Sequence, residues 1–135
     1  MKVLLIRMFI VLSVQIARFT IGFSWLYHGI FPKLIHIAPI EKAMTASIGL
    51  NEQTAYLLTK SAGVAEVIFG VLFIVLYRSR FIVLANIAAL VALLIFVAVR
   101  QPHFLIEAFN PVTTNMSLIA LSVILLDNVK LVGKR

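Results

Sequence analysis

Residues 81–99 read FIVLANIAALVALLIFVAV, a stretch of 19 residues without a formal charge. An α-helix rises about 1.5 Å per residue, so this stretch covers about 28 Å and matches the hydrocarbon core of a bilayer. Arg80 precedes it and Arg100 follows it, which places a charge at each end. The stretch therefore predicts a membrane-spanning helix, and with it an integral membrane protein.

The composition of the whole chain supports this prediction. The 135 residues, enough for one domain over residues 1–135, are 62% hydrophobic and 13% charged, against about 45–50% and about 25% in soluble domains. A chain this small cannot bury so much apolar surface in a water-facing fold. The net charge of +7 does not indicate nucleic-acid binding, because the basic residues stand at the ends of apolar runs. The lack of cysteine excludes disulfides and thiolate chemistry.

Three further apolar runs complete a predicted all-α membrane bundle of four helices. They cover residues 8–30, 55–77 and 112–126. Pro32 is expected to end the first helix, and Asn51 is expected to cap the start of the second. The fourth run is short for a full span, so residues 104–109 are a candidate re-entrant piece.

The segment between the first two spans, residues 36–54, is too polar to cross a bilayer. Pro39 suits the first turn of a short helix, and Gly49 suits its end. Ile40, Met44 and Ile48 would share one face of that helix, whereas Glu41, Lys42 and Ser47 would lie elsewhere. This pattern predicts a short interfacial helix that lies flat on the bilayer.

Basic residues are distributed unequally between the two sides of the predicted bundle. One side holds seven, Lys2, Arg7, Arg78, Arg80, Lys130, Lys134 and Arg135, and the other holds four, Lys33, Lys42, Lys60 and Arg100. Loops that are rich in Lys and Arg remain in the cytoplasm. We therefore expect both termini to lie on the cytoplasmic side of the cytoplasmic membrane.

Two charged side chains, Arg18 and Glu66, fall inside predicted spans. A charge at mid-membrane costs about 2.5–3.5 kcal/mol on insertion scales, so such residues usually face the bundle interior and pair. Counted from Arg7 and Tyr77, each lies 11 residues, or about 16 Å, from the same surface. Small residues that permit close helix packing flank both sites: Gly22, Gly29, Gly63 and Gly70. This predicts an Arg18–Glu66 ion pair, either as a lock between helices or as part of a functional site.

The remaining polar residues gather toward the predicted outer face. They are Lys33, His36, Arg100, His103, Glu107, Asn110 and Asn115. Two histidines and one carboxylate on separate loops favour interface residues over a metal site, so no metal is predicted. Asn86 is expected to hydrogen-bond between helices. We predict one continuous ligand pocket from the midplane to the outer surface, with these candidate residues: Arg18, Trp25, Lys33, Glu66, Glu107, Asn110 and Asn115.

Three segments of the chain resemble the motifs of DoxX-like membrane proteins. Arg18 with WLYHGIFPKL at residues 25–34 resembles their first-helix motif, and GVAEVIFG at residues 63–70 resembles their second-helix motif. EAFNPVTTN at residues 107–115 is similar to the segment before their fourth helix. The resemblance keeps its order and spacing over nearly the whole chain, and it implies a small four-helix membrane protein.

What the resemblance implies about function is limited. The wider DoxX and DoxD group includes membrane subunits linked to quinone-dependent oxidoreductases, for example in thiosulfate oxidation. The related vitamin K epoxide reductase type of bundle uses cysteine pairs, which this chain lacks. The sequence has no haem, flavin, iron–sulfur or dinucleotide motif, so an electron-carrying cofactor would be a quinone or would belong to a partner.

Three functions therefore remain open, and so does enzymatic activity. The first is a membrane component of a redox system that contacts a quinone or an oxidoreductase partner, membrane-bound or soluble. The second is a non-catalytic assembly or stabilising subunit. The third is a small-solute or proton carrier, which an intramembrane carboxylate suits. Because a four-helix monomer encloses little room, the third function would require a homo-oligomer.

The predicted orientation can be tested with reporter fusions after Ser79 and after Lys134. Both positions should report a cytoplasmic location, because both follow clusters of the more basic side. A periplasmic signal at either position would contradict the orientation.

Overall fold

The computed structural model describes residues 2–132, and it describes side chains within residues 5–128. Lys134 and Arg135, two of the basic residues behind the predicted orientation, lie outside these residues, as do the side chains of Lys2 and Lys130. The described chain is all-helical. Its five α-helices are α1 (Lys2–Gly29), α2 (Pro39–Ala46), α3 (Glu52–Leu76), α4 (Arg80–Arg100) and α5 (Pro111–Val132).

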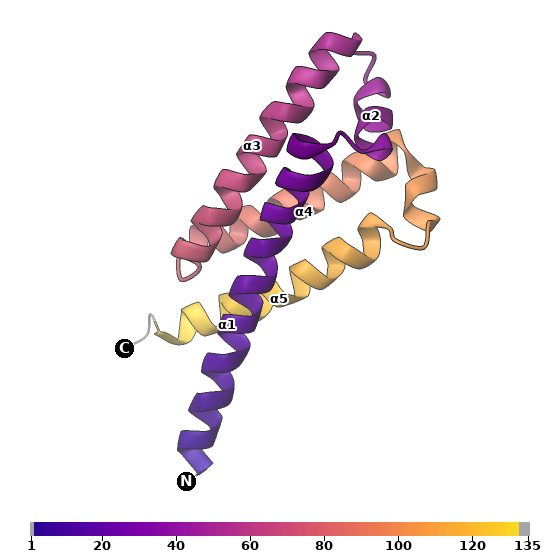
Figure 1. Ribbon diagram of the computed structural model, residues 1–135. Coiled ribbons are helices and arrows are strands. Elements are labelled where there is room, and N and C mark those ends of the chain that lie inside the picture. The colour runs from indigo at the N-terminus through magenta and orange to yellow at the C-terminus, as the bar shows by residue number, and fades with distance from the viewer. Residues whose placement is uncertain (1, 133–135) are drawn as a thin grey trace.

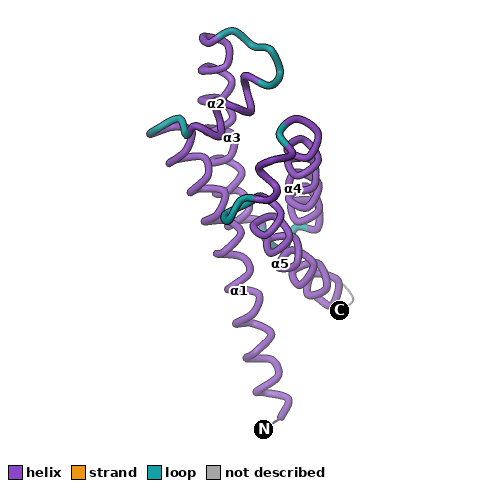
Figure 2. Tube along the Cα trace, turned by 90° about the vertical axis from the view of Figure 1, so that its right-hand side faces the viewer, coloured by secondary structure: helices purple, strands orange, loops and turns teal. Residues whose placement is uncertain are grey.

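The four long helices form two antiparallel pairs (Figures 1 and 2). Helix α1 packs mainly against α3, and α4 packs mainly against α5, while α1 also contacts α5 and joins the pairs. The N-terminal half of α1 projects beyond the other helices (Figure 1). The buried core lies where the pairs meet, and its fully buried side chains include Ile21, Phe73, Val83 and Leu125.

Within the described residues, three helical segments are long and apolar enough to cross a membrane. They are Leu5–Ile35, Glu52–Leu76 and Arg80–Arg100. Large apolar side chains remain exposed on them, among them Phe9, Phe23 and Val75. A surface of this kind is compatible with a lipid bilayer and not with water. The sequence located these three segments, although the first extends to Ile35, beyond its predicted end at residue 30.

The first helix does not end at Pro32 as the sequence predicted. It continues as a π-helix over Ile30–Ile35, and the His36 N–H donates to the Phe31 carbonyl at 3.1 Å, five residues back. A proline in an α-helix clashes with the carbonyl four residues before it and lacks an N–H. The wider π-turn accommodates both, so Pro32 changes the helix type instead of ending the helix.

The starts of the later helices follow their capping residues. Asn51 accepts a hydrogen bond from the Thr54 N–H at 2.8 Å and begins α3 three residues earlier than expected.

Residues 102–106 form a short 3-10 helix. Helix α5 then covers 22 residues, about 33 Å, so it is longer than the sequence predicted and needs no re-entrant piece to reach membrane thickness.

Glycines bring α1 and α3 into backbone contact. A Cβ on Gly29 would lie 2.6 Å from the Gly63 carbonyl oxygen, and a Cβ on Gly70 would lie 3.0 Å from the Gly22 carbonyl oxygen. The two glycines on each helix are seven residues apart, two turns, so each pair lies on one face. These contacts fix the axial register between the two helices.

Asn86 joins three helices, which confirms its predicted role between helices. Its Oδ1 accepts from the Trp25 indole N–H of α1 at 2.6 Å, and its Nδ2 donates to the Ser122 hydroxyl of α5 at 2.8 Å. Asn86 and Ser122 are fully buried. Hydrogen bonds within an apolar bundle have no competing water. These two hydrogen bonds therefore hold α4 and α5 against α1.

We expect Gly29→Ala to destabilise the protein by about 1–3 kcal/mol, as overpacking of a tight interface does. The added methyl would meet the Gly63 backbone, which cannot rotate away as a side chain can. The free energy of unfolding in detergent micelles measures the loss. Ala65→Val, which enlarges an exposed position of α3, is the control and should change it by less than about 0.5 kcal/mol. Equal effects of the two variants would contradict the role of the glycine contact.

Candidate functional site

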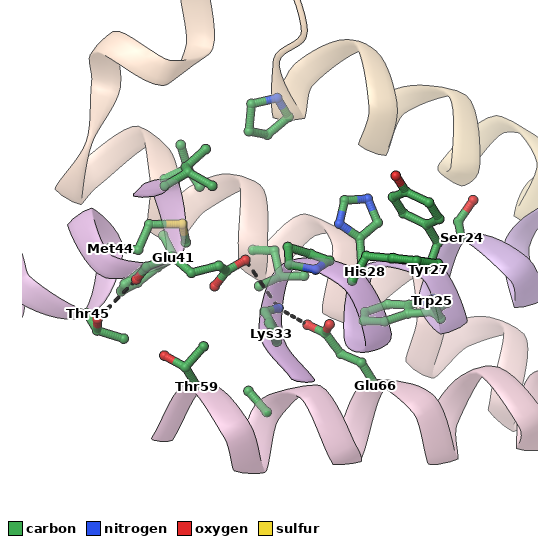
Figure 3. A pocket seen from close by; sticks show the side chains of 18 of the residues that line it. Ser24, Trp25, Tyr27, His28, Lys33, Glu41, Met44, Thr45, Thr59 and Glu66 are labelled. Carbon is green, nitrogen blue, oxygen red and sulfur yellow. Dashed lines mark hydrogen bonds and ion pairs between the residues drawn. The ribbon is translucent and has the colours of Figure 1, made fainter. Parts of the chain in front are cut away.

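A cavity of about 830 Å³ lies between the two helix pairs, beneath α2. The C-terminal end of α1, its π-helix extension, α2 and α3 form one side, and α4 and α5 close the other. Most of the wall is apolar, with contributions from Leu58, Leu90, Leu93, Phe96, Val97 and Leu118. Figure 3 shows the cavity from close by, with the Lys33 ammonium between the carboxyl groups of Glu41 and Glu66.

Three charged side chains from three elements meet in this cavity. The Lys33 ammonium of the π-helix donates to Glu66 Oε1 of α3 and lies 3.5 Å from Glu41 Oε1 of α2. The exposed fractions of the Lys33 and Glu66 side chains are only 10% and 12%. We refer to Lys33, Glu41 and Glu66 as the Lys33 triad.

The π-helix gives Lys33 its position. The π-turn extends the helical path past Pro32, so that the lysine stem lies against α3 instead of leaving for the interface. Gly63 provides the space, because a Cβ there would lie 2.9 Å from Lys33 Cβ. A larger residue at position 63 would push the stem away from the Glu66 carboxylate one turn along α3.

The Lys33 triad holds two carboxyl groups for one ammonium. Glu41 belongs to α2, outside the three candidate spans, and burial raises its pKa above the ordinary value, although the Lys33 ammonium opposes the rise. Glu41 therefore binds its proton more tightly in the folded protein than in the unfolded chain. Its contribution to stability is present below the ordinary glutamate pKa and is lost as the pH rises through the raised one.

The second carboxylate oxygen of Glu66 is unsatisfied. Glu66 Oε2 is buried and has no hydrogen-bond partner among the residues that the structure describes. Most buried polar atoms are paired, so an exception in a cavity wall marks a place where a ligand atom can bind. Glu66 lines the cavity together with Lys33 and Glu41.

Trp25 forms a rigid aromatic part of the same wall. Its indole lies edge-on to Phe69 with ring centroids 5.0 Å apart, and its N–H is engaged by Asn86. Trp25 is buried and lines the cavity. A fixed indole face offers a flat ligand ring a packing surface without loss of side-chain freedom.

The predicted Arg18–Glu66 ion pair is wrong. The Arg18 guanidinium donates instead to the Ile74 carbonyl at 2.7 Å and to Gln15 Oε1 at 3.0 Å, and it stacks on the Tyr77 ring at 4.4 Å. Its role is structural, because it satisfies a carbonyl in the last turn of α3.

The error arose from the depth estimate. The estimate placed Arg7 level with Tyr77, whereas the Gln15 amide donates to the Tyr77 hydroxyl at 3.4 Å. The N-terminal half of α1 projects past α3 (Figure 1), so the true register differs by eight residues, or about 12 Å. Glu66 therefore lies nearer the C-terminal end of the first helix, where Lys33 reaches it.

Four of the seven candidate residues line the cavity, and three do not. Trp25, Lys33, Glu66 and Asn115 belong to the wall. Arg18, Glu107 and Asn110 lie outside it, so the predicted pocket is not continuous over all seven. Glu107 is exposed, and Asn110 Oδ1 accepts from the Thr113 N–H at 3.1 Å as the cap of α5. The sequence Asn-Pro-x-Thr at residues 110–113 is a recognisable helix start.

The sequence analysis missed Glu41, His28 and Thr59, which also line the cavity. Glu41 was expected to point away from the Ile40 face of α2, yet it contacts Lys33. A carboxylate in the first turn of a short helix gave no sign of this contact, because the fold of the preceding loop decides it. Among the described residues, no three His, Asp or Glu side chains lie close enough to hold a metal ion.

Comparison with known proteins identifies the family. Residues 22–123 match the profile of the DoxX-like family over three quarters of the chain. The chain belongs to the DoxX-like family. The matched region contains the Lys33 triad, Trp25 and all four packing glycines. Searches of curated proteins and of solved structures find no significant match to this DoxX-like protein.

A double-mutant cycle can test the Lys33–Glu66 pair. Lys33→Met leaves buried carboxylates without their cation and should cost about 3–5 kcal/mol of unfolding free energy in detergent micelles. Adding Glu66→Leu should recover part of this loss, because it removes the unpaired charge.

The control cycle combines Arg18→Leu with Glu66→Leu. These two residues share no partner, so their effects should add within about 0.5 kcal/mol. Additivity in the Lys33–Glu66 cycle, or coupling in the Arg18–Glu66 cycle, would contradict the pairing described above.

Proposed function

We propose that this DoxX-like protein binds a lipophilic ring compound of the quinone class and serves as a membrane component of a redox system. The observation that carries this proposal is a charged cluster, the Lys33 triad, in the wall of a largely apolar cavity within apolar helices. Pockets for small molecules typically have about 300–1,000 Å³, and this cavity has about 830 Å³.

The chemistry of the wall fits an amphiphilic ring. Trp25 packs against the flat face of the ring, while the remaining N–H of the Lys33 ammonium, which has three donors, binds an oxygen on it. The leucine-rich wall of α4 and α5 accommodates an isoprenoid tail. The protein then holds the ring, and a membrane-bound or soluble oxidoreductase partner supplies or accepts its electrons.

The proposal includes a topology in the cytoplasmic membrane. All four long helices cross the bilayer as one domain, both termini lie in the cytoplasm, and α2 lies at the opposite interface. In support, α5 is about as long as a membrane is thick, and the start of α1 and the end of α5 lie toward the opposite end of the molecule from α2 (Figure 1).

An assembly or stabilising subunit is the second candidate function. The observation that favours it is the projecting N-terminal half of α1, where large side chains such as Phe9, Val11 and Leu12 are more than half exposed. This apolar surface offers a docking face for a membrane partner or a second copy of the chain.

A variant that fills the cavity tests the proposal without touching its charges. Ala62 lines the cavity from α3, and Ala65, one turn further, is exposed on the same helix. The full protein in detergent micelles is titrated with a short-tailed benzoquinone, and the shift of its melting temperature gives the affinity. Ala62→Phe should weaken binding at least about tenfold, or about 1.4 kcal/mol.

Ala65→Phe is the matched control and should bind as the wild type does. Lipid extracts of protein purified from quinone-rich membranes should also contain quinone in near-stoichiometric amounts. Quinone-free protein whose melting temperature does not respond to added quinone would contradict the redox function and favour the assembly subunit.

A further inference from the structure

The cavity presents an excess of hydrogen-bond acceptors. Glu66 Oε2 is a buried acceptor that no described residue engages, and an ionised carboxylate can only accept. The neighbouring Lys33 ammonium donates to Glu66 and lies 3.5 Å from Glu41 Oε1, so part of its donor capacity is already used within the protein. The polar end of the cavity therefore needs a ligand that donates a proton in a hydrogen bond.

Several other donors in the wall are already used within the protein. The Thr59 hydroxyl donates to the Ala55 carbonyl at 2.9 Å, and the Ser24 hydroxyl donates to the Thr20 carbonyl at 2.7 Å. The Asn115 amide donates to the Leu90 carbonyl at 3.1 Å. With the Trp25 indole committed to Asn86, these side chains add little that could compensate a ligand made only of acceptors. The wall also contains Tyr27, His28 and His36, so the preference for a donating ligand rests on Glu66 Oε2.

We propose that the cavity binds the reduced, dihydroxy form of its ring ligand more tightly than the oxidised, dicarbonyl form, with Glu66 Oε2 accepting from one ring hydroxyl. This inference rests on the proposed quinone function and names the redox state that the site selects. A hydroquinone hydroxyl donates to Glu66 and accepts from Lys33 at once. A quinone carbonyl can only accept, so it brings an oxygen lone pair against the carboxylate and leaves Glu66 Oε2 unsatisfied.

Charge supports the same preference. The ammonium of the Lys33 triad is shared between two carboxyl groups, so Glu66 Oε2 gains from a further hydrogen-bond donor even where Glu41 carries a proton. Hydrogen bonds to charged groups are also stronger than those between neutral groups. We expect the hydroquinone to bind at least about tenfold more tightly than the quinone.

The test compares one compound in two redox states. The full-length protein in detergent micelles is titrated anaerobically by calorimetry with a short-tailed benzoquinone, and then with the same compound reduced to its hydroquinone. The chain has no cysteine, so the reductant has no disulfide to break. The chain's only tryptophan, Trp25, lines the cavity, so its fluorescence reports whether each ligand reaches this site.

The dimethyl ether of the hydroquinone is the control on the ligand side. It keeps the ring and both oxygens but has no hydroxyl to donate, so it should bind at least about tenfold more weakly than the hydroquinone. This comparison uses only the wild-type protein and does not depend on the folding of a variant.

Glu66→Gln is the decisive variant. Glutamine keeps a carbonyl oxygen for Lys33 and replaces the free acceptor by an amide donor, so the preference for the hydroquinone should disappear or reverse. Glu52→Gln, an exposed change at the start of the same helix, should leave both affinities unchanged.

The outcomes separate this inference from the function on which it rests. Equal or tighter binding of the quinone in the wild type would overturn the inference and leave the quinone function standing. Failure of both redox forms to bind would overturn the quinone function as well. A preference for the hydroquinone that persists in a folded Glu66→Gln variant would overturn the role of Glu66.

Discussion

The backbone contact between α1 and α3 is the constraint on which the other features depend. Gly29 meets Gly63 and Gly22 meets Gly70 with no room for a Cβ, so the two helices can pack this closely in only one axial register. That register brings Arg18 to the last turn of α3 and leaves Glu66 opposite the end of the first helix. It therefore decides which buried charges meet, and it does so without any charged contact of its own.

The π-helix at Ile30–Ile35 is the second determinant, and it works together with the first. An α-helix that ended at Pro32 would release the chain before Lys33 could reach α3. The π-turn extends the helical path by one turn and keeps Lys33 between Glu66 and α2, where Glu41 can approach it. Pro32 therefore helps to build the site, because the wider turn that it favours directs Lys33 into the cavity.

The sequence predicted the local features of this fold well and the long-range ones poorly. Span positions, the cap at Asn51 and the bonding of Asn86 depend on hydropathy and on neighbouring residues, which a single sequence contains. The cap at Asn110 has the same local origin, but the sequence analysis assigned Asn110 to the pocket instead. The partner of Glu66 could not be predicted, because depth was counted on the assumption that Arg7 and Tyr77 lie at the same surface. The packing glycines were recognised, but the sequence does not say which glycine of α1 meets which glycine of α3. Glu41 was missed for the same reason, since a loop and not a helical period brings it to Lys33.

Two buried polar clusters among the described residues differ in how completely their hydrogen bonds are satisfied, and this difference indicates different roles. In the group of Trp25, Asn86 and Ser122, the indole N–H, the Asn86 amide and the Ser122 hydroxyl each donate to an acceptor, and the side chains are almost fully enclosed. Such a closed network holds helices together and leaves nothing for a ligand. The Lys33 triad has an excess carboxyl group and an unsatisfied oxygen, and it faces a cavity instead of a packed core. Buried ion pairs contribute little net stability, and apolar residues of similar volume would often hold the helices equally well. The cost of keeping this triad in an apolar setting is therefore better explained by binding than by folding.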